Sequence, residues 1–167
     1  MVKPVKKGTY RVKAEGKNII SAPPAKVWAA LHDPAILRQT LPSCYDVISR
    51  PDGTFEALIA HKLGPIQIQM GVMVDLTDIV TNEQMQLSCH GRMRGMGGLE
   101  MDLMVHLAAH PTGTQVTYQG TLKPQGLIGR AIRGQSSTLV MRASNRFMQN
   151  LAQHMRKAGQ QIGRAHV

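Results

Sequence analysis

Residues 136–158, SSTLVMRASNRFMQNLAQHMRKA, decide which fold this chain can adopt. The segment contains neither proline nor glycine. Its apolar residues recur at spacings of three and four, which is typical of an amphipathic helix; they are Val140, Ala143, Phe147, Leu151 and Met155. At about 1.5 Å per residue, the 23 residues would form a helix roughly 35 Å long, enough to cross a whole domain.

The segments before this helix alternate apolar and polar residues, the pattern of strands with one buried face. Residues 66–76, IQIQMGVMVDL, show it most clearly, with an apolar side chain at every second position. The same pattern predicts further strands at 12–21, 44–49, 54–63, 84–93 and 99–107, and a last one after the turn at 111–113. Because short turns join the later strands, they should form an antiparallel meander.

Two short helices are expected after the first strand. Ser21-Ala22-Pro23-Pro24 stops that strand, and Asp33-Pro34 separates residues 24–32 from residues 34–41. A sheet with one apolar face has to cover it, and only residues 136–158 are large enough to do so. The sequence therefore predicts an α+β fold: a curved antiparallel sheet of about seven strands wrapped around a long C-terminal helix, with two short helices after strand one.

The length of 167 residues fits a single domain. We expect the domain to span residues 12–158, with a flexible basic arm at 1–11 and a tail at 159–167. No apolar run approaches the roughly 20 residues that cross a bilayer, and no apolar segment of a secretory signal follows the basic N-terminus. These observations predict a cytoplasmic protein.

The net charge of +10 is unevenly distributed along the chain. Residues 103–167 carry eight basic and no acidic side chains, whereas residues 18–102 carry a net charge of −3. This asymmetry favours contact with an anionic surface; a solvated face that keeps the protein soluble is the alternative. Nucleic acid is not expected, because few aromatic residues that could stack on bases accompany the basic side chains, Tyr10 and Phe147 among them.

No catalytic or metal site is expected from the motifs. The seven histidines show no paired ligand spacing, and the two cysteines are too few for a metal cluster. Nothing in the sequence would lower the pKa of Cys44, which is interpreted as structural. His61 has inward strand parity, but no carboxylate is placed to orient it as a general base, so a core or rim histidine is the preferred interpretation.

The predicted core is rich in methionine and poor in aromatic residues. The chain has six aromatic residues, while ten methionines lie between positions 70 and 155. Methionine suits surfaces that accept flexible apolar ligands, although ordinary core packing is the alternative. Since one helix rarely fills a wide curved sheet, we expect an apolar pocket beneath it. Strand parity and the helix stripe predict these wall residues: Phe55, Ile59, Met70, Val72, Met85, Met101, Leu103, Tyr118, Val140 and Phe147.

Polar groups are expected at two places in or near that pocket. Tyr118 and His61 are the predicted ligand handles, because either can hydrogen-bond a carbonyl oxygen.

A second candidate site is a membrane contact just before the long helix. There, the apolar side chains would enter the membrane and the arginines would lie at the headgroups, unless the apolar residues simply fasten the linker to the domain. The candidate residues are Leu127, Ile128, Arg130, Ile132 and Arg133.

Several motifs resemble the carbon monoxide dehydrogenase G-subunit family, which belongs to the helix-grip START and birch-pollen-allergen (SRPBCC) superfamily. The resemblance covers roughly residues 12–158. Ser43 stands where the family usually has glycine, and the glycine-rich stretch is shorter and richer in methionine than is usual. The motifs are Glu15-Gly16, Ala22-Pro23-Pro24-Ala25-Lys26-Val27-Trp28, Leu31-His32-Asp33-Pro34, Leu41-Pro42-Ser43-Cys44, Lys62-Leu63-Gly64-Pro65 and the glycine-rich residues 91–98.

The resemblance implies a non-catalytic carrier of a hydrophobic ligand, an isoprenoid quinone or another lipid. It implies no metal or covalently bound cofactor. As partners it implies a carbon monoxide dehydrogenase-like molybdenum hydroxylase and an anionic membrane, with the protein peripheral on the inner face of the cell membrane. A polyketide cyclase or dehydratase type of enzyme and a ligand-free adaptor for the dehydrogenase are the alternatives. An apolar cavity would favour the carrier, a polar hydrogen-bonded end the enzyme, and a filled core the adaptor.

Overall fold

The computed structural model describes residues 11–134 and 136–165. The strands are β1 (Val12–Ile20), β2 (Cys44–Ser49), β3 (Phe55–Leu63), β4 (Ile66–Val80), β5 (Gln84–Met93), β6 (Gly97–His110) and β7 (Gly113–Gln125). The helices are α1 (Pro24–Leu31), α2 (Pro34–Thr40), α3 (Gly126–Ile132) and α4 (Ser136–Ala165). The strands form one antiparallel seven-stranded sheet in the order β1-β7-β6-β5-β4-β3-β2.

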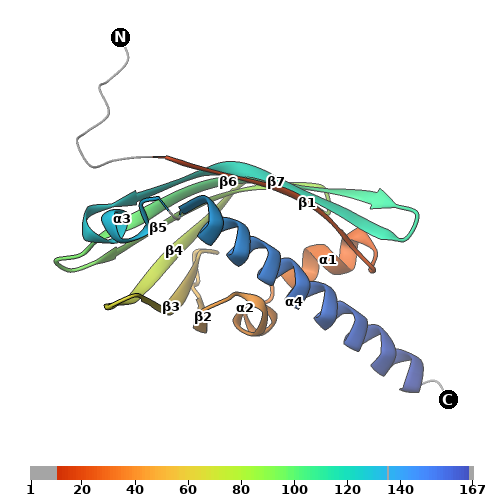
Figure 1. Ribbon diagram of the computed structural model, residues 1–167. Coiled ribbons are helices and arrows are strands. Elements are labelled where there is room, and N and C mark those ends of the chain that lie inside the picture. The colour runs from red at the N-terminus through yellow and green to blue at the C-terminus, as the bar shows by residue number, and fades with distance from the viewer. Residues whose placement is uncertain (1–10, 135, 166–167) are drawn as a thin grey trace, which may run out of the picture.

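The curved sheet surrounds one side of α4, with α1 and α2 beside that helix (Figure 1). The helix-grip architecture predicted from the sequence is therefore confirmed. Both short helices begin at a proline, whose missing N–H costs nothing in the first helical turn. Asp33 caps α2, because its carboxylate accepts a hydrogen bond of 2.9 Å from the backbone N–H of Ala35. The side-chain amide of Asn150 then ties α4 to the end of α2 by donating to the carbonyl of Thr40, at 3.0 Å.

Helix α4 is longer than the sequence predicted. It continues beyond Ala158 to Ala165, so the predicted tail at 159–167 is helical over most of its length. The predicted end coincided with Gly159, but one glycine costs a helix only about 1 kcal/mol relative to alanine and does not end it. Residues 1–10 of the predicted arm lie outside the described part of the chain.

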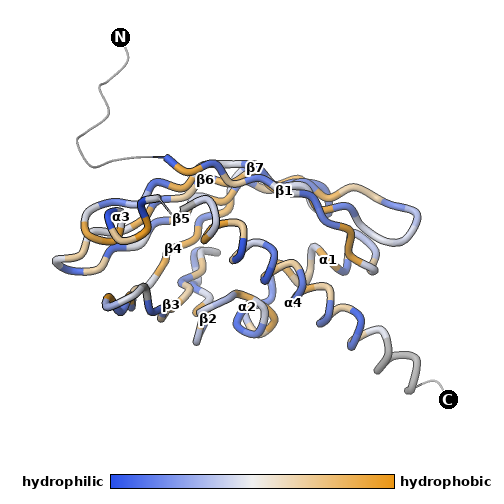
Figure 2. Tube along the Cα trace, viewed as in Figure 1, coloured by the Kyte–Doolittle hydropathy of each residue, from blue (hydrophilic) through white to orange (hydrophobic). Residues whose placement is uncertain are grey.

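The core consists of two packed clusters rather than one. The larger cluster packs α1 and the second half of α4 on β6 and β7, with Leu151 fully buried at its centre. The smaller one joins Ile68 and Met70 of β4 to Ile128 of α3. Figure 2 shows hydrophobic and hydrophilic residues alternating along the strands and along α4, as one-sided burial requires.

Candidate functional site

A cavity of about 450 Å³ lies between the concave face of the sheet and α4. All seven strands contribute lining side chains, and so do α1, α2 and α4. Almost every lining side chain is apolar, and none of the described lining residues carries a charge. The cavity is partly open to the outside, since Ala143 on its border is exposed.

The cavity exists because α4 presents small side chains to one half of the sheet. Leu151 and Met155 fill the core where α4 crosses the end of the sheet beside α1. Two turns earlier the same helix contributes Ala143 and Ser144, which cannot reach the sheet. As a result, Met101 of β6 points inward yet remains only partly buried, whereas Leu107 farther along the same strand is buried.

Nine of the eleven predicted ligand-binding residues line this one cavity. They come from five strands and from α4, and strand parity was enough to identify those on the strands. The nine are Phe55, Ile59, Val72, Met85, Met101, Leu103, Tyr118, Val140 and Phe147.

Met70 was predicted in the pocket wall but belongs to the smaller packed cluster. Its inward parity on β4 is the predicted one. Gly91 of β5 lies opposite Val72, two residues along β4, and the sulfur of Met70 lies 2.9 Å from where a side chain at position 91 would begin. Met70 therefore fills the space that Gly91 leaves and packs with Ile128, which closes the cavity toward α3.

His61 was predicted as a polar handle inside the pocket, and that placement is wrong. The side chain is exposed near the end of β3. Its Nδ1 lies 2.8 Å from the hydroxyl oxygen of Ser43, at the turn that leads into β2. Strand parity correctly indicated the face of the sheet, since the register sets His61 opposite buried Ile68, but parity does not tell which side chains near the end of a strand stay exposed.

The wall contributed by the two short helices was not predicted from the sequence. Leu31 of α1 and Leu37 of α2 line the cavity, followed by Leu41 and Pro42. The signal was available, because these leucines are apolar residues on short amphipathic helices that have only the sheet's open side to cover. The Leu41-Pro42 pair of the Leu41-Pro42-Ser43-Cys44 motif thus belongs to the cavity wall.

Three polar groups border the cavity: the hydroxyls of Tyr118 and Ser144, and the thiol of Cys89. Burial raises the pKa of the Cys89 thiol to about 12, and the negative charges of Asp102 and Asp75 add to this effect. Cys89 is therefore a neutral thiol at physiological pH. Burial likewise raises the pKa of the Cys44 thiol, which donates a hydrogen bond to the carbonyl of Asp46 at 3.2 Å.

The ring of Tyr118 lies over a glycine on the adjacent strand. The β1–β7 register sets Gly16 directly opposite Tyr118. A side chain at position 16 would collide with the tyrosine ring and hydroxyl, so the ring occupies the space above the glycine. Only 8% of Tyr118 remains exposed, and no described residue hydrogen-bonds to its hydroxyl.

The family model of the carbon monoxide dehydrogenase G subunit (CoxG) matches residues 16–156, which contain the whole cavity wall except Ala14. This chain belongs to the CoxG family. No curated protein matches it significantly.

Solved structures support the fold of this CoxG family member. A conserved protein from Geobacillus kaustophilus has a TM-score of 0.78 at 19% identity, covering 88% of this chain and 97% of its own. A protein from Rhizobium leguminosarum has a TM-score of 0.67 at 18% identity, covering 89% and 97%. A Staphylococcus aureus protein of unknown function reaches 0.65 at 11% identity, covering 91% and 98%. At such identities the likeness concerns the fold alone.

Helix α3 holds the residues predicted to meet a membrane, and the structure separates them into two groups. Leu127 is 43% exposed, and Arg130 and Arg133 are exposed as well. Ile128 and Ile132 are 1% and 9% exposed, so their predicted insertion into a membrane is wrong. Ile128 packs against β4, because the apolar side of α3 completes the smaller cluster.

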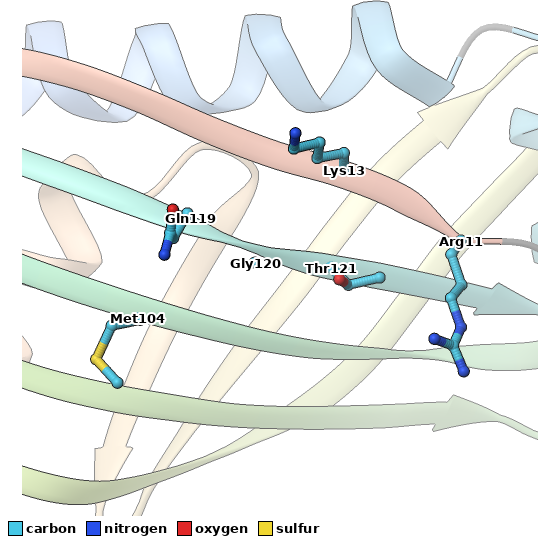
Figure 3. Close-up of a pocket in the computed structure, with 6 residues that line it drawn as sticks. All are labelled: Arg11, Lys13, Met104, Gln119, Gly120 and Thr121. Carbon is cyan, nitrogen blue, oxygen red and sulfur yellow. The ribbon is translucent and has the colours of Figure 1, made fainter.

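A second hollow, of about 510 Å³, lies on the face of the sheet opposite α4. Arg11 and Lys13 border it, with Met104, Gln119, Gly120 and Thr121 from β6 and β7 (Figure 3). It is a shallow, open depression among outward-pointing side chains. In the part of the chain that the structure describes, no three potential metal ligands gather, and no helix has the length and apolar composition to cross a membrane.

Proposed function

We propose that this member of the CoxG family is a non-catalytic carrier of a hydrophobic small molecule. The cavity is the observation that supports this function. Its volume of about 450 Å³ is within the range of small-molecule sites, and its wall is almost wholly apolar. An adaptor without a ligand would need no hollow core, and an enzyme of the cyclase type would need reactive polar groups in the wall. The described lining residues include no histidine, carboxylate, lysine or arginine.

The ligand we propose is an isoprenoid quinone. A cavity of about 150 Å³ takes one benzene molecule, so about 450 Å³ holds on the order of 18 non-hydrogen atoms. A quinone ring with its first isoprene units fits this space, and a longer tail would continue through the open side beside Ala143. Carrying electrons in this form would let the protein serve a carbon monoxide dehydrogenase-like molybdenum hydroxylase at the membrane.

Membrane contact would occur beside the α3–α4 junction. Leu127 and Met141 are 43% and 57% exposed, and Arg130, Arg142 and Arg146 supply exposed positive charge without any acidic residue after Asp102. Each basic group near an anionic bilayer contributes about 1 kcal/mol. The protein would then be peripheral on the inner face of the cell membrane, with the open side of its cavity toward the lipid.

Native mass spectrometry of protein purified together with membrane lipids tests the carrier function. We expect one bound species with the mass of a quinone, and its loss in Met101→Trp, which fills the cavity. Met104→Trp is the matched control, because Met104 lies on the same strand but borders the outer hollow (Figure 3). Protein that carries no small molecule after this purification, and takes up none when quinone is added, would contradict the carrier.

Sedimentation with vesicles tests the membrane contact separately. Binding to anionic vesicles should fall steeply with salt and with the double change Leu127→Asp and Arg130→Glu. Arg92→Glu is the control, since it introduces the same arginine-to-glutamate change on the exposed face of β5, opposite the face on which Met93 packs with α3. Equal binding to neutral vesicles, or an equal effect of Arg92→Glu, would show that α3 does not dock.

A further inference from the structure

The Tyr118 hydroxyl is an unusual feature of the apolar cavity. Buried tyrosines normally find a partner for their O–H group. Tyr118 is more than nine-tenths buried, and no described residue hydrogen-bonds to its hydroxyl. In the described residues, every fully enclosed side-chain nitrogen or oxygen has a partner. The hydroxyl of Tyr118 therefore retains accessible surface, and the residue lines the cavity.

Gly16 leaves room for the ring and hydroxyl of Tyr118 on β1. The tyrosine ring occupies the volume that a side chain at position 16 would take, directly across the β1–β7 pair. On its other side, Tyr118 pairs with Val105, which offers no hydrogen-bonding side chain. The donor thus lies midway along the β1–β7 pair, without an acceptor among the described residues.

The remaining polar groups of the wall differ from Tyr118 in strength or position. The thiol of Cys89 is a weak donor and stays protonated. Ser144 lies on α4 next to exposed Ala143, at the open side of the cavity. Since none of the described lining residues is charged, an ionised group placed inside would lack a counter-charge and would be strongly disfavoured.

We infer that the cavity recognises an uncharged head group through one hydrogen bond, donated by the Tyr118 hydroxyl to a carbonyl or ether oxygen of the ligand. This inference rests on the proposed carrier function and specifies which end of the ligand enters. The head group lies at Tyr118, in the closed part of the cavity, and the apolar tail points toward Ala143. Carbonyl compounds, quinones among them, satisfy these requirements, whereas alkanes and carboxylates do not.

A pair of matched probes tests the hydrogen bond. Tridecan-2-one and n-tridecane have the same chain length and differ in one carbonyl oxygen, and both are small enough for the cavity. Their affinities are measured by displacement of the neutral dye Nile red. Tyr118→Phe keeps the ring, so we expect it to weaken ketone binding about two- to tenfold while leaving the alkane unchanged. Infrared spectra of ¹³C-carbonyl-labelled ketone should show the carbonyl band at lower frequency in the wild type than in Tyr118→Phe.

Controls separate this inference from the carrier function itself. Ser144→Ala should leave the carbonyl band unchanged, and tridecanoate at pH 8 should bind at least tenfold more weakly than the ketone. If both probes bind but lose affinity equally in Tyr118→Phe, or if Ser144→Ala shifts the carbonyl band, the inference about Tyr118 is wrong. The proposed carrier function is not affected by that result. Equal binding of tridecanoate would overturn the uncharged head group. If neither neutral probe binds, the carrier function itself fails.

Discussion

At the scale of single residues, the cavity depends on which positions lack a side chain. Gly16 leaves room for the ring of Tyr118, and Gly91 leaves room for the sulfur of Met70. The first pair places Tyr118 in the cavity wall, and the second closes the cavity toward α3. Neither effect follows from the residues taken alone, because each glycine acts through its neighbour on the adjacent strand.

Gly16→Ala should destabilise the protein through Tyr118. The added methyl group would collide with the ring, and such overpacking costs about 1–3 kcal/mol of unfolding free energy. The cost should be much smaller in a Tyr118→Ala background, since residues in contact are not additive. Urea unfolding of the four variants in this double-mutant cycle measures the difference. Additive effects would show that the ring does not occupy the space above Gly16.

Met101→Trp should reduce the uptake of apolar ligands without unfolding the protein. The larger side chain enters an empty cavity rather than a filled core, so it does not cause the strain of overpacking. It instead takes up the volume that a ligand would occupy. We expect affinity for tridecan-2-one to fall about tenfold or more, measured by dye displacement, with a midpoint of thermal unfolding close to the wild type. Met104→Trp on the outer face should change neither quantity.

At the scale of elements, α4 has two halves with different tasks. Its second half, with Leu151 and Met155, packs in the larger cluster, which Met148 near the end of the first half also joins. Its first half faces the cavity with Val140, Ala143 and Ser144. The amphipathic stripe runs through both halves, and the size of the side chains distinguishes the half that fills the core from the half that borders the cavity.

Truncations along this stripe should separate stability from binding. Leu151→Ala should lower the unfolding free energy by about 2–5 kcal/mol, because it opens a hole in a filled core. Phe147→Ala should cost less despite the larger side chain, because the half-buried ring already borders empty space. Ligand affinity should change in the opposite order, with the larger loss in Phe147→Ala. Denaturant unfolding and dye displacement measure the two losses in both variants. If the same variant lost more unfolding free energy and more ligand affinity, the two parts of α4 would not have separate tasks.

At the scale of the whole molecule, two packed clusters hold an unfilled volume between them. The clusters stabilise the ends of the sheet, so the middle can stay open without loss of the fold. The charge is concentrated on one part of the chain, because α3 and α4 carry basic residues and no acidic residue follows Asp102 in the sequence. Arg142 and Arg146 lie on the stretch of α4 that lines the cavity, which is the placement that the proposed transfer at a membrane requires.

The cavity volume predicts a limit on ligand length. In a series of methyl ketones, each added CH₂ group should improve binding about fourfold while it is buried, from roughly 0.8 kcal/mol per group. The gain should stop near 18 non-hydrogen atoms, roughly the number that about 450 Å³ can hold. Dye displacement across the series locates the break, and Met101→Trp should move it to shorter chains. A constant gain far beyond this length would mean that the cavity is larger or extends into the outside surface.

The sequence by itself determined the strands, the helices α1, α2 and α4, and the inward face of each strand; it did not predict α3. Alternation at every second residue identified the strands, spacings of three and four identified α4, and prolines identified α1 and α2. These periodicities follow from local backbone geometry, which each segment carries with it. They were therefore enough to place Phe55, Met101 and Tyr118 in one wall.

Only the tertiary structure decided what covers each inward face. His61 has inward parity but is exposed near the end of β3, while Ile128 and Ile132 are buried instead of facing outward. Met70 fills the space above Gly91, a relation between strands that parity within one strand does not contain. The cavity also depends on more than one element, because it remains where the side chains of α4 are too short to reach the sheet.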